Sequence, residues 1–184
     1  YERSAYSKGA VFLGQLGYII GFDKLFETLQ TYYDEWKFKH PLPNDFRRIA
    51  ERVSGLQLQW SLTDWNHTTN KIYYALSEVK ENCTTSILQL ERKEVMPMPL
   101  EVLVVLKNGQ NELHYIPISL MRGEKENTYP LNREDHPDWA WANLKYRLEI
   151  NHSKDAIEAI VIDPSNLMAD VDKSNNYYAP TAAE

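Results

Sequence analysis

The sequence predicts an α+β fold, in which an all-helical N-terminal unit is followed by an antiparallel β-sandwich. Over residues 1–66 the apolar residues recur at three- and four-residue steps, which is the period of an amphipathic helix. From residue 67 the period changes to two, and turn residues separate short alternating runs. Helices followed by strands are typical of α+β proteins and of two-domain chains. We therefore expect one domain over 1–66 and a second over 67–184.

Three helices and a short fourth are expected in the first domain. A strongly apolar helix should end at Gly21, since glycine avoids the Cβ penalty at a helix C-terminus. Asp23 suits the N-cap of a second helix, and Asn44 or Asp45 suits the N-cap of a third. That third helix should end at Gly55. A short apolar segment at helical steps follows it.

Six or seven short strands are expected in the second domain. The clearest is an alternating run from Met98 to Leu106, which Asn108-Gly109 follows. This dipeptide is the strongest short-range signal for a β-hairpin. A last apolar strand should close at Asp163-Pro164, and the polar chain from Ser165 onward should be an irregular tail. Such a series of strands and turns is typical of an antiparallel β-sandwich.

Composition excludes several classes of function. The 184 residues carry a formal net charge of −6, with Lys and Arg scattered among acids, so we expect no nucleic-acid partner. No apolar run reaches the length of a membrane span. The single cysteine, Cys83, excludes an intrachain disulfide and a cysteine-rich metal site. Because the chain starts at Tyr1, we expect a processed form or an excised fragment, and the sequence does not fix its compartment.

Tyr6 is the residue with the best-placed side chain for chemistry. It lies at the start of the apolar helix, where a phenol can be held rigidly while its hydroxyl stays accessible. Composition alone favours a packing role, because the chain has 12 tyrosines and tyrosine is an amphipathic packing residue.

The run Ala5-Tyr6-Ser7-Lys8-Gly9-Ala10 resembles the tyrosine segment of the aminopeptidase N-like zinc metallopeptidases, the gluzincins. In that family a Tyr-x-Lys-Gly run lies downstream of the HExxH zinc helix and of a third ligand, a glutamate. The run from Tyr33 to Phe46, together with Trp60, is similar to the last helices of the family's thermolysin-like catalytic domain. The resemblance is strong over 1–66 and looser afterwards. It implies that the strands form the immunoglobulin-like β-sandwich that follows this domain in many members.

The resemblance also implies roles for two tyrosines. Tyr6 would be catalytic and donate a hydrogen bond to the tetrahedral intermediate, and Tyr1 would match a second active-site tyrosine that binds substrate. The substrates would be peptides with free N-termini, and the intact parent enzyme would hold zinc. This chain has no HExxH motif, so the fragment should bind no catalytic zinc and be inactive alone.

Three further expectations follow from the resemblance. The helical unit should pack on the missing N-terminal part of the catalytic domain. The face left exposed by its absence should be apolar and prone to self-association. Family members of this build are often exported, to the periplasm or by secretion.

The remaining candidates are interpreted as structural. The five histidines contain no His-x3-His pair, and we expect each to be a surface or turn residue, so no metal ligand is predicted. His136, near Asp135 and Asp138, is the most ligand-like, and a solvated acidic loop is the preferred interpretation. Trp139 and Trp141 should share one strand face by period two, as sandwich core. The alternative function is a non-catalytic module, in which the sandwich binds a partner or a glycan.

Overall fold

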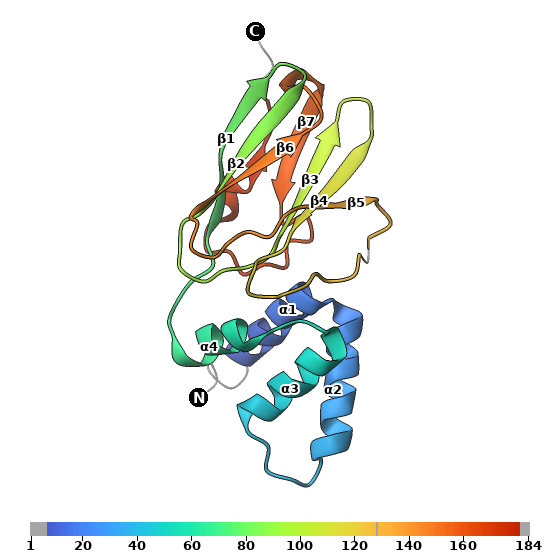
Figure 1. Ribbon diagram of the computed structural model, residues 1–184, viewed down its shortest axis with the longest axis vertical. Coiled ribbons are helices and arrows are strands. Elements are labelled where there is room, and N and C mark those ends of the chain that lie inside the picture. The colour runs from blue at the N-terminus through green and yellow to red at the C-terminus, as the bar shows by residue number, and fades with distance from the viewer. Residues whose placement is uncertain (1–6, 128, 181–184) are drawn as a thin grey trace. The chain divides into compact units, whose positions relative to one another are not determined.

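The computed structural model describes residues 7–127 and 129–180, and Tyr1 and Tyr6 lie outside these ranges. The chain divides into two compact units (Figure 1). The helical unit comprises Tyr1–Asn70 and Ser119–Thr128, and the sandwich unit comprises Lys71–Ile118 and Tyr129–Glu184.

Four α-helices form the helical unit: α1 (Gly9–Ile20), α2 (Phe22–Trp36), α3 (Pro43–Ser54) and α4 (Gln59–His67). Helix α2 packs against both α1 and α3. The C-terminal half of α1 is buried, and Leu16 and Ile19 pack into the core of the unit with Leu25 and Ile49. The buried half of this apolar helix thus contributes to the core of the helical unit.

The helix ends are set by glycine and proline. Gly21 (φ +89°) separates α1 from α2, and Gly55 (φ +74°) ends α3 in the left-handed conformation, as predicted. The predicted N-caps were wrong, because α2 begins at Phe22 and α3 begins at Pro43. Proline is pre-organised for the first helical position. Asp45 instead lies in the first turn, where its carboxylate accepts a hydrogen bond from the backbone N–H of residue 42, at 2.8 Å.

Residues 119–128 belong with the helices rather than with the strands on either side. Lys125 is 7% exposed, and its ammonium group donates a hydrogen bond of 2.9 Å to the carbonyl oxygen of Tyr18. The same ammonium nitrogen lies 4.6 Å from the centroid of the Tyr18 ring. The N–H of Gln57 donates to the carbonyl oxygen of Met121, at 2.9 Å. These contacts attach the segment to α1 and to the chain that follows α3.

Two sheets form the sandwich unit (Figure 1). The first has the strand order β1-β2-β6, and the second has the order β5-β4-β3-β7-β8. The strands are β1 (Tyr74–Asn82), β2 (Thr85–Arg92), β3 (Leu100–Leu106), β4 (Asn111–Ile116), β5 (Arg133–Asp135), β6 (Lys145–Ile150), β7 (Ile157–Ile162) and β8 (Tyr177–Tyr178). Two short 3₁₀ turns, Lys154–Ala156 and Lys173–Asn175, lie between the later strands. The α+β class is therefore confirmed.

The pairing of the strands differs from the prediction at one edge. Strands β4 and β5 run parallel, whereas the other described pairs are antiparallel. The long segment between β4 and β5 allows this, since a parallel pair needs a crossover and not a tight turn. The hairpin at Asn108-Gly109 is confirmed: it joins β3 to β4, and Gly109 has φ +84°.

The two tryptophans at 139 and 141 do not share a strand face. Trp139 is 3% exposed, forms an isolated bridge with Ile118, and packs edge-on against Tyr74 at 5.6 Å between ring centroids. Trp141 lies in the turn that follows and is 51% exposed. The core role is thus correct for Trp139 and wrong for Trp141, because the turn interrupts the period-two alternation.

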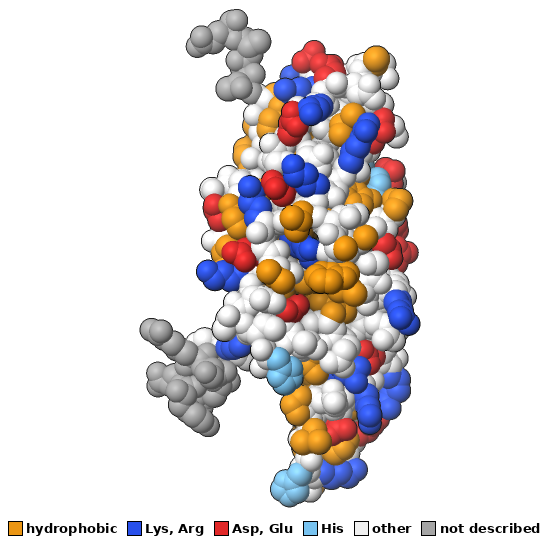
Figure 2. Space-filling model, turned by 60° about the vertical axis from the view of Figure 1, so that its left-hand side comes forward, with side chains coloured by type: hydrophobic (Ala, Val, Ile, Leu, Met, Phe, Trp, Pro, Cys, Tyr) orange, Lys and Arg blue, Asp and Glu red, His pale blue; other side chains and the backbone are white. Residues whose placement is uncertain are grey.

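None of the helices within the described residues is long and apolar enough to cross a membrane. Figure 2 shows Lys and Arg side chains intermixed with Asp and Glu over the face that it presents. On that face the two signs of charge are intermixed, as they are along the sequence.

Candidate functional site

The two tyrosines predicted for the active site, Tyr6 and Tyr1, lie outside the described residues, so their roles stay predictions. The structure does describe the surroundings of the helix that follows them. Helix α1 begins at Gly9, three positions after Tyr6, and the exposed Lys8 occupies its N-cap position.

An open recess lies beside this first turn. It has a volume of about 190 Å³ and is lined by Lys8, Gly9 and Phe12 of the α1 region and by Trp65 and Asn66 of α4. The rings of Phe12 and Trp65 meet edge to face, with 6.1 Å between centroids. The indole N–H of Trp65 is buried and has no acceptor among residues 7–127 and 129–180. The recess thus combines an apolar wall with a lysine at its edge.

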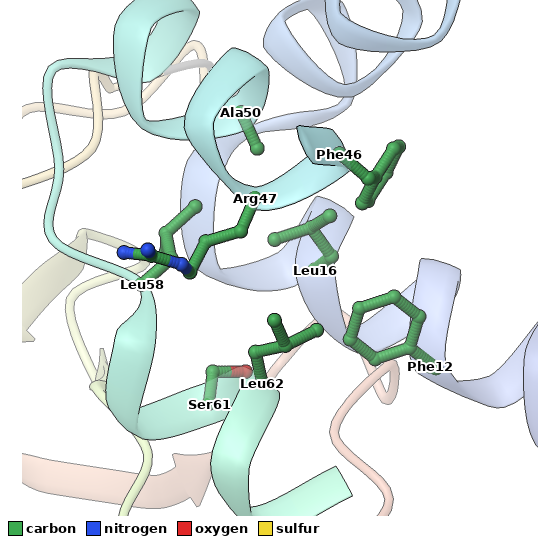
Figure 3. A pocket seen from close by; sticks show the side chains of 8 residues that line it. All are labelled: Phe12, Leu16, Phe46, Arg47, Ala50, Leu58, Ser61 and Leu62. Atoms are coloured by element: carbon green, nitrogen blue, oxygen red, sulfur yellow. The ribbon is translucent and has the colours of Figure 1, made fainter. Parts of the chain in front are cut away.

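A second hollow in the helical unit is a packing gap. Figure 3 shows its lining side chains converging from α1, α3 and the α4 region; they are Phe12, Leu16, Phe46, Arg47, Ala50, Leu58, Ser61 and Leu62. Its volume of about 10 Å³ is close to the minimum that holds one water molecule. The Arg47 guanidinium is paired with Glu51 at 2.9 Å. This gap has no room for a substrate.

The sandwich unit contains a cluster of titratable side chains that the sequence analysis did not predict. His114 lies on β4, Glu134 lies opposite it on β5, and His136 follows β5 directly. The ring nitrogens His114 Nδ1 and His136 Nε2 are 2.9 Å apart. Glu134 carboxylate oxygens lie 3.6 Å from His114 Nδ1 and 4.0 Å from His136 Nε2.

The expectation that each histidine is a surface or turn residue was wrong for His114, which is 2% exposed. Burial, together with the neighbouring His136, lowers the pKa of His114 to about 4, against the opposing effect of Glu134. Burial also lowers the pKa of His136, against the opposing charges of Glu134 and Asp135. Both imidazoles are therefore neutral at neutral pH, so one facing nitrogen donates a hydrogen bond to the other.

The signal for this cluster is hidden in the sequence by its spacing. Twenty-two positions separate His114 from His136, and only the parallel pairing of β4 with β5 brings them together. The alternation on β4 also gives no warning, since Leu113, His114 and Tyr115 are all buried. A strand covered on both faces loses the period-two pattern that would mark one face as polar.

Comparisons with known proteins do not identify the chain: no protein-family model matches it, and neither does any curated protein. The assignment of function therefore depends on the residues themselves.

Proposed function

We propose that this chain is the C-terminal portion of a zinc-dependent aminopeptidase that removes N-terminal residues from peptides. It would comprise the end of a thermolysin-like catalytic domain and an immunoglobulin-like β-sandwich. The observation that carries the proposal is the run from Ala5 to Ala10, which leads directly into the apolar helix α1. The sequence contains no HExxH motif, so the residues present do not fit a catalytic zinc. The zinc ligands would come from outside this chain, which would be inactive alone.

Tyr6 is the residue of this chain that would act on the substrate. Its hydroxyl would donate a hydrogen bond to the oxyanion that develops on the scissile carbonyl. A donor positioned in advance for that charge contributes about 3 kcal/mol to lowering the barrier. The place of Tyr6 before a helix with a buried C-terminal half supports this role, because rigid elements position catalytic groups better than loops. Tyr1 would bind substrate nearby.

Exposed apolar side chains on the helices support the expected packing against a missing part of a catalytic domain. Phe26 of α2 is 64% exposed, Val11 of α1 is 42% exposed and Phe22 is 38% exposed. Phe22 and Phe26 are four positions apart on α2 and so lie on one side of this helix. A contiguous apolar patch is typical of a surface that another element covers. In the parent enzyme that element would be the rest of the catalytic domain. In the isolated chain, a second copy would cover the face.

The test is Tyr6→Phe in the parent enzyme that contains this chain. We expect kcat on a peptide substrate to fall about a hundred- to a thousandfold with KM little changed, because the lost hydrogen bond acts in the transition state. Tyr33→Phe, at a 65% exposed position of α2, is the matched control and should leave kcat unchanged. An unchanged kcat for Tyr6→Phe would exclude the catalytic role.

A non-catalytic binding module is the second candidate function. The observation that favours it is Trp141, an exposed indole of the sandwich unit whose ring lies 5.8 Å from the Arg92 guanidinium. An exposed tryptophan can stack on a sugar ring or a partner's side chain. The coding sequence upstream of Tyr1 discriminates between the two candidates. An HExxH motif with a later glutamate there would support the aminopeptidase, and the lack of these ligands would favour the module.

A further inference from the structure

We propose that His114, Glu134 and His136 form a binding site for one divalent transition-metal ion in the sandwich unit. The site would be separate from any catalytic zinc, and it requires no part of the proposed aminopeptidase function. It also goes against the sequence-based prediction that the chain contributes no metal ligand.

The ligand atoms are close enough to share one ion. Metal bonds to imidazole nitrogen and carboxylate oxygen are about 2.0–2.2 Å long, so two ligand atoms of one ion are at most about 4.4 Å apart, and about 3.4 Å apart at a tetrahedral angle. The two ring nitrogens of His114 and His136 are 2.9 Å apart, and the distances from Glu134 oxygens to them are 3.6 and 4.0 Å. These two Glu134 distances belong to different oxygens of its carboxylate, and with one ligand atom taken from each residue the three atoms lie within 4.8 Å of one another. One ion can therefore bind all three side chains with only small rotations.

The protonation of the pair allows an ion to enter. In the metal-free pair one facing nitrogen carries a hydrogen and the other accepts it. When an ion binds, that proton is exchanged through water to the outer nitrogen of the same ring, so no net proton is released. Both facing lone pairs, of His114 Nδ1 and His136 Nε2, then point to the metal. A neutral imidazole is the form that binds metals.

The outer nitrogen of His114 supports this arrangement. Nε2 of this 2% exposed residue makes no hydrogen bond within the described part of the chain. A carboxylate oxygen of Glu112 lies 3.7 Å from this nitrogen, and the other oxygen of Glu112 lies 2.8 Å from His152 Nε2. A carboxylate behind a metal-bound histidine fixes its tautomer and orientation. A small movement that shortens the 3.7 Å distance between His114 Nε2 and the Glu112 carboxylate would let Nε2–H donate a hydrogen bond to Glu112.

The fold holds the three ligands in place without a metal. The backbone N–H of His136 donates to the carbonyl oxygen of Tyr115, at 2.9 Å. The Arg133 side chain pairs with Asp135 at 2.6 Å and lies over the Tyr115 ring, with 4.4 Å from the guanidinium carbon to the centroid. These contacts fix β5 beside β4 and so fix Glu134 beside His114. The Glu134 side chain is 59% exposed, which gives an ion and its water ligands a route from solvent.

The donor set favours transition metals over magnesium and calcium. Imidazole nitrogen suits zinc, copper, iron and nickel, whereas magnesium and calcium prefer sites built from oxygen. Zinc is the natural first probe, because it is redox-inactive and takes nitrogen and carboxylate ligands.

The experiment is calorimetric titration of Zn²⁺ into the 184-residue chain, produced without a polyhistidine tag. We expect one saturable equivalent of Zn²⁺, and no binding of Mg²⁺ at the same concentrations. Glu134→Gln and His136→Gln should each weaken the zinc affinity by at least about tenfold, and Glu112→Gln by about ten- to a hundredfold. His67→Gln, at an exposed position of the helical unit, is the control and should leave the affinity unchanged.

The imidazole NMR signals of His114 and His136 should shift on adding one equivalent of zinc, and circular dichroism should show each variant folded. Glu134→Gln keeps the test decisive if a histidine variant fails to fold, because the Glu134 side chain is exposed. The proposal is overturned if the chain binds no saturable equivalent of Zn²⁺, or if the Glu134→Gln variant binds zinc as tightly as the unsubstituted chain. It is also overturned if His67→Gln loses as much affinity as Glu134→Gln.

Discussion

The residues to which we assign functions are arranged differently in the helical unit and in the sandwich unit. In the helical unit the proposed functional residues belong to a contiguous run, Ala5 to Ala10, that can be read before any fold is known. In the sandwich unit the proposed metal ligands are three side chains, two from the neighbouring strands β4 and β5 and one from the residue after β5, and no local pattern in the sequence marks them. A motif survives as a sequence signal when one element supplies it. A site built from side chains of several elements can be recognised only when the pairing of those elements is known.

If the helical unit and the sandwich unit have separate cores, a core substitution in one should leave the other folded. Leu88→Ala tests this with the largest expected effect on stability. Leu88 is fully buried in β2, and removing such a side chain costs about 2–5 kcal/mol of unfolding free energy. Hydrogen exchange should show faster exchange for the amides of β1, β2 and β6, while the amides of α1 and α2 keep their protection.

Thr85→Ala is the control for Leu88→Ala, since Thr85 is only half-buried at the end of the same strand and its loss should reduce protection far less. Equal loss of protection in both units would show that the chain unfolds as one cooperative structure. The two regions could then no longer be treated as separate.

A pair of glycine substitutions sharpens the comparison with effects of opposite sign. Gly109 in the hairpin has φ +84°, so Gly109→Ala should destabilise the sandwich unit by about 1 kcal/mol. Gly14 lies inside α1, where an added Cβ meets no atom within 4 Å, so Gly14→Ala should stabilise the helical unit by about 0.5–1 kcal/mol. Urea denaturation measures both changes. Destabilisation by Gly14→Ala would mean that this face of α1 is tightly covered.

The sequence predicts the elements that depend on local chemistry. The Asn108-Gly109 hairpin, the left-handed Gly55 and the change of period between helices and strands all agree with the structure. Each is decided by the backbone preferences of a few neighbouring residues. The start of α3 was missed because Pro43 takes the first helical position ahead of Asn44 and Asp45.

The features that were missed depend on contacts between distant residues. Lys125 reads as a surface residue in a polar stretch, yet its ammonium group is held by the carbonyl and ring of Tyr18, 107 positions earlier. His114 is buried because β5 returns to pair with β4 in parallel, and no turn signal predicts that return. The burial of Trp139 and the exposure of Trp141 were missed as a pair because Trp141 lies in a turn, which breaks the alternation assumed for the two residues.

Phe26→Glu has the smallest expected effect on stability and tests the exposed face of the helical unit. Phe26 is 64% exposed, so the substitution should change the unfolding free energy by no more than about 0.5 kcal/mol. If the apolar face drives self-association, sedimentation should show that the unsubstituted 184-residue chain dimerises as its concentration rises, whereas the Phe26→Glu variant stays monomeric. Leu144→Glu is the matched control, since Leu144 is 60% exposed in the sandwich unit and its change should leave dimerisation intact.

An unsubstituted chain that stays monomeric at high concentration would show that these exposed side chains are stable in contact with water. That result would count against packing of these side chains on a catalytic domain, while the expected zinc binding of the sandwich unit would be unaffected.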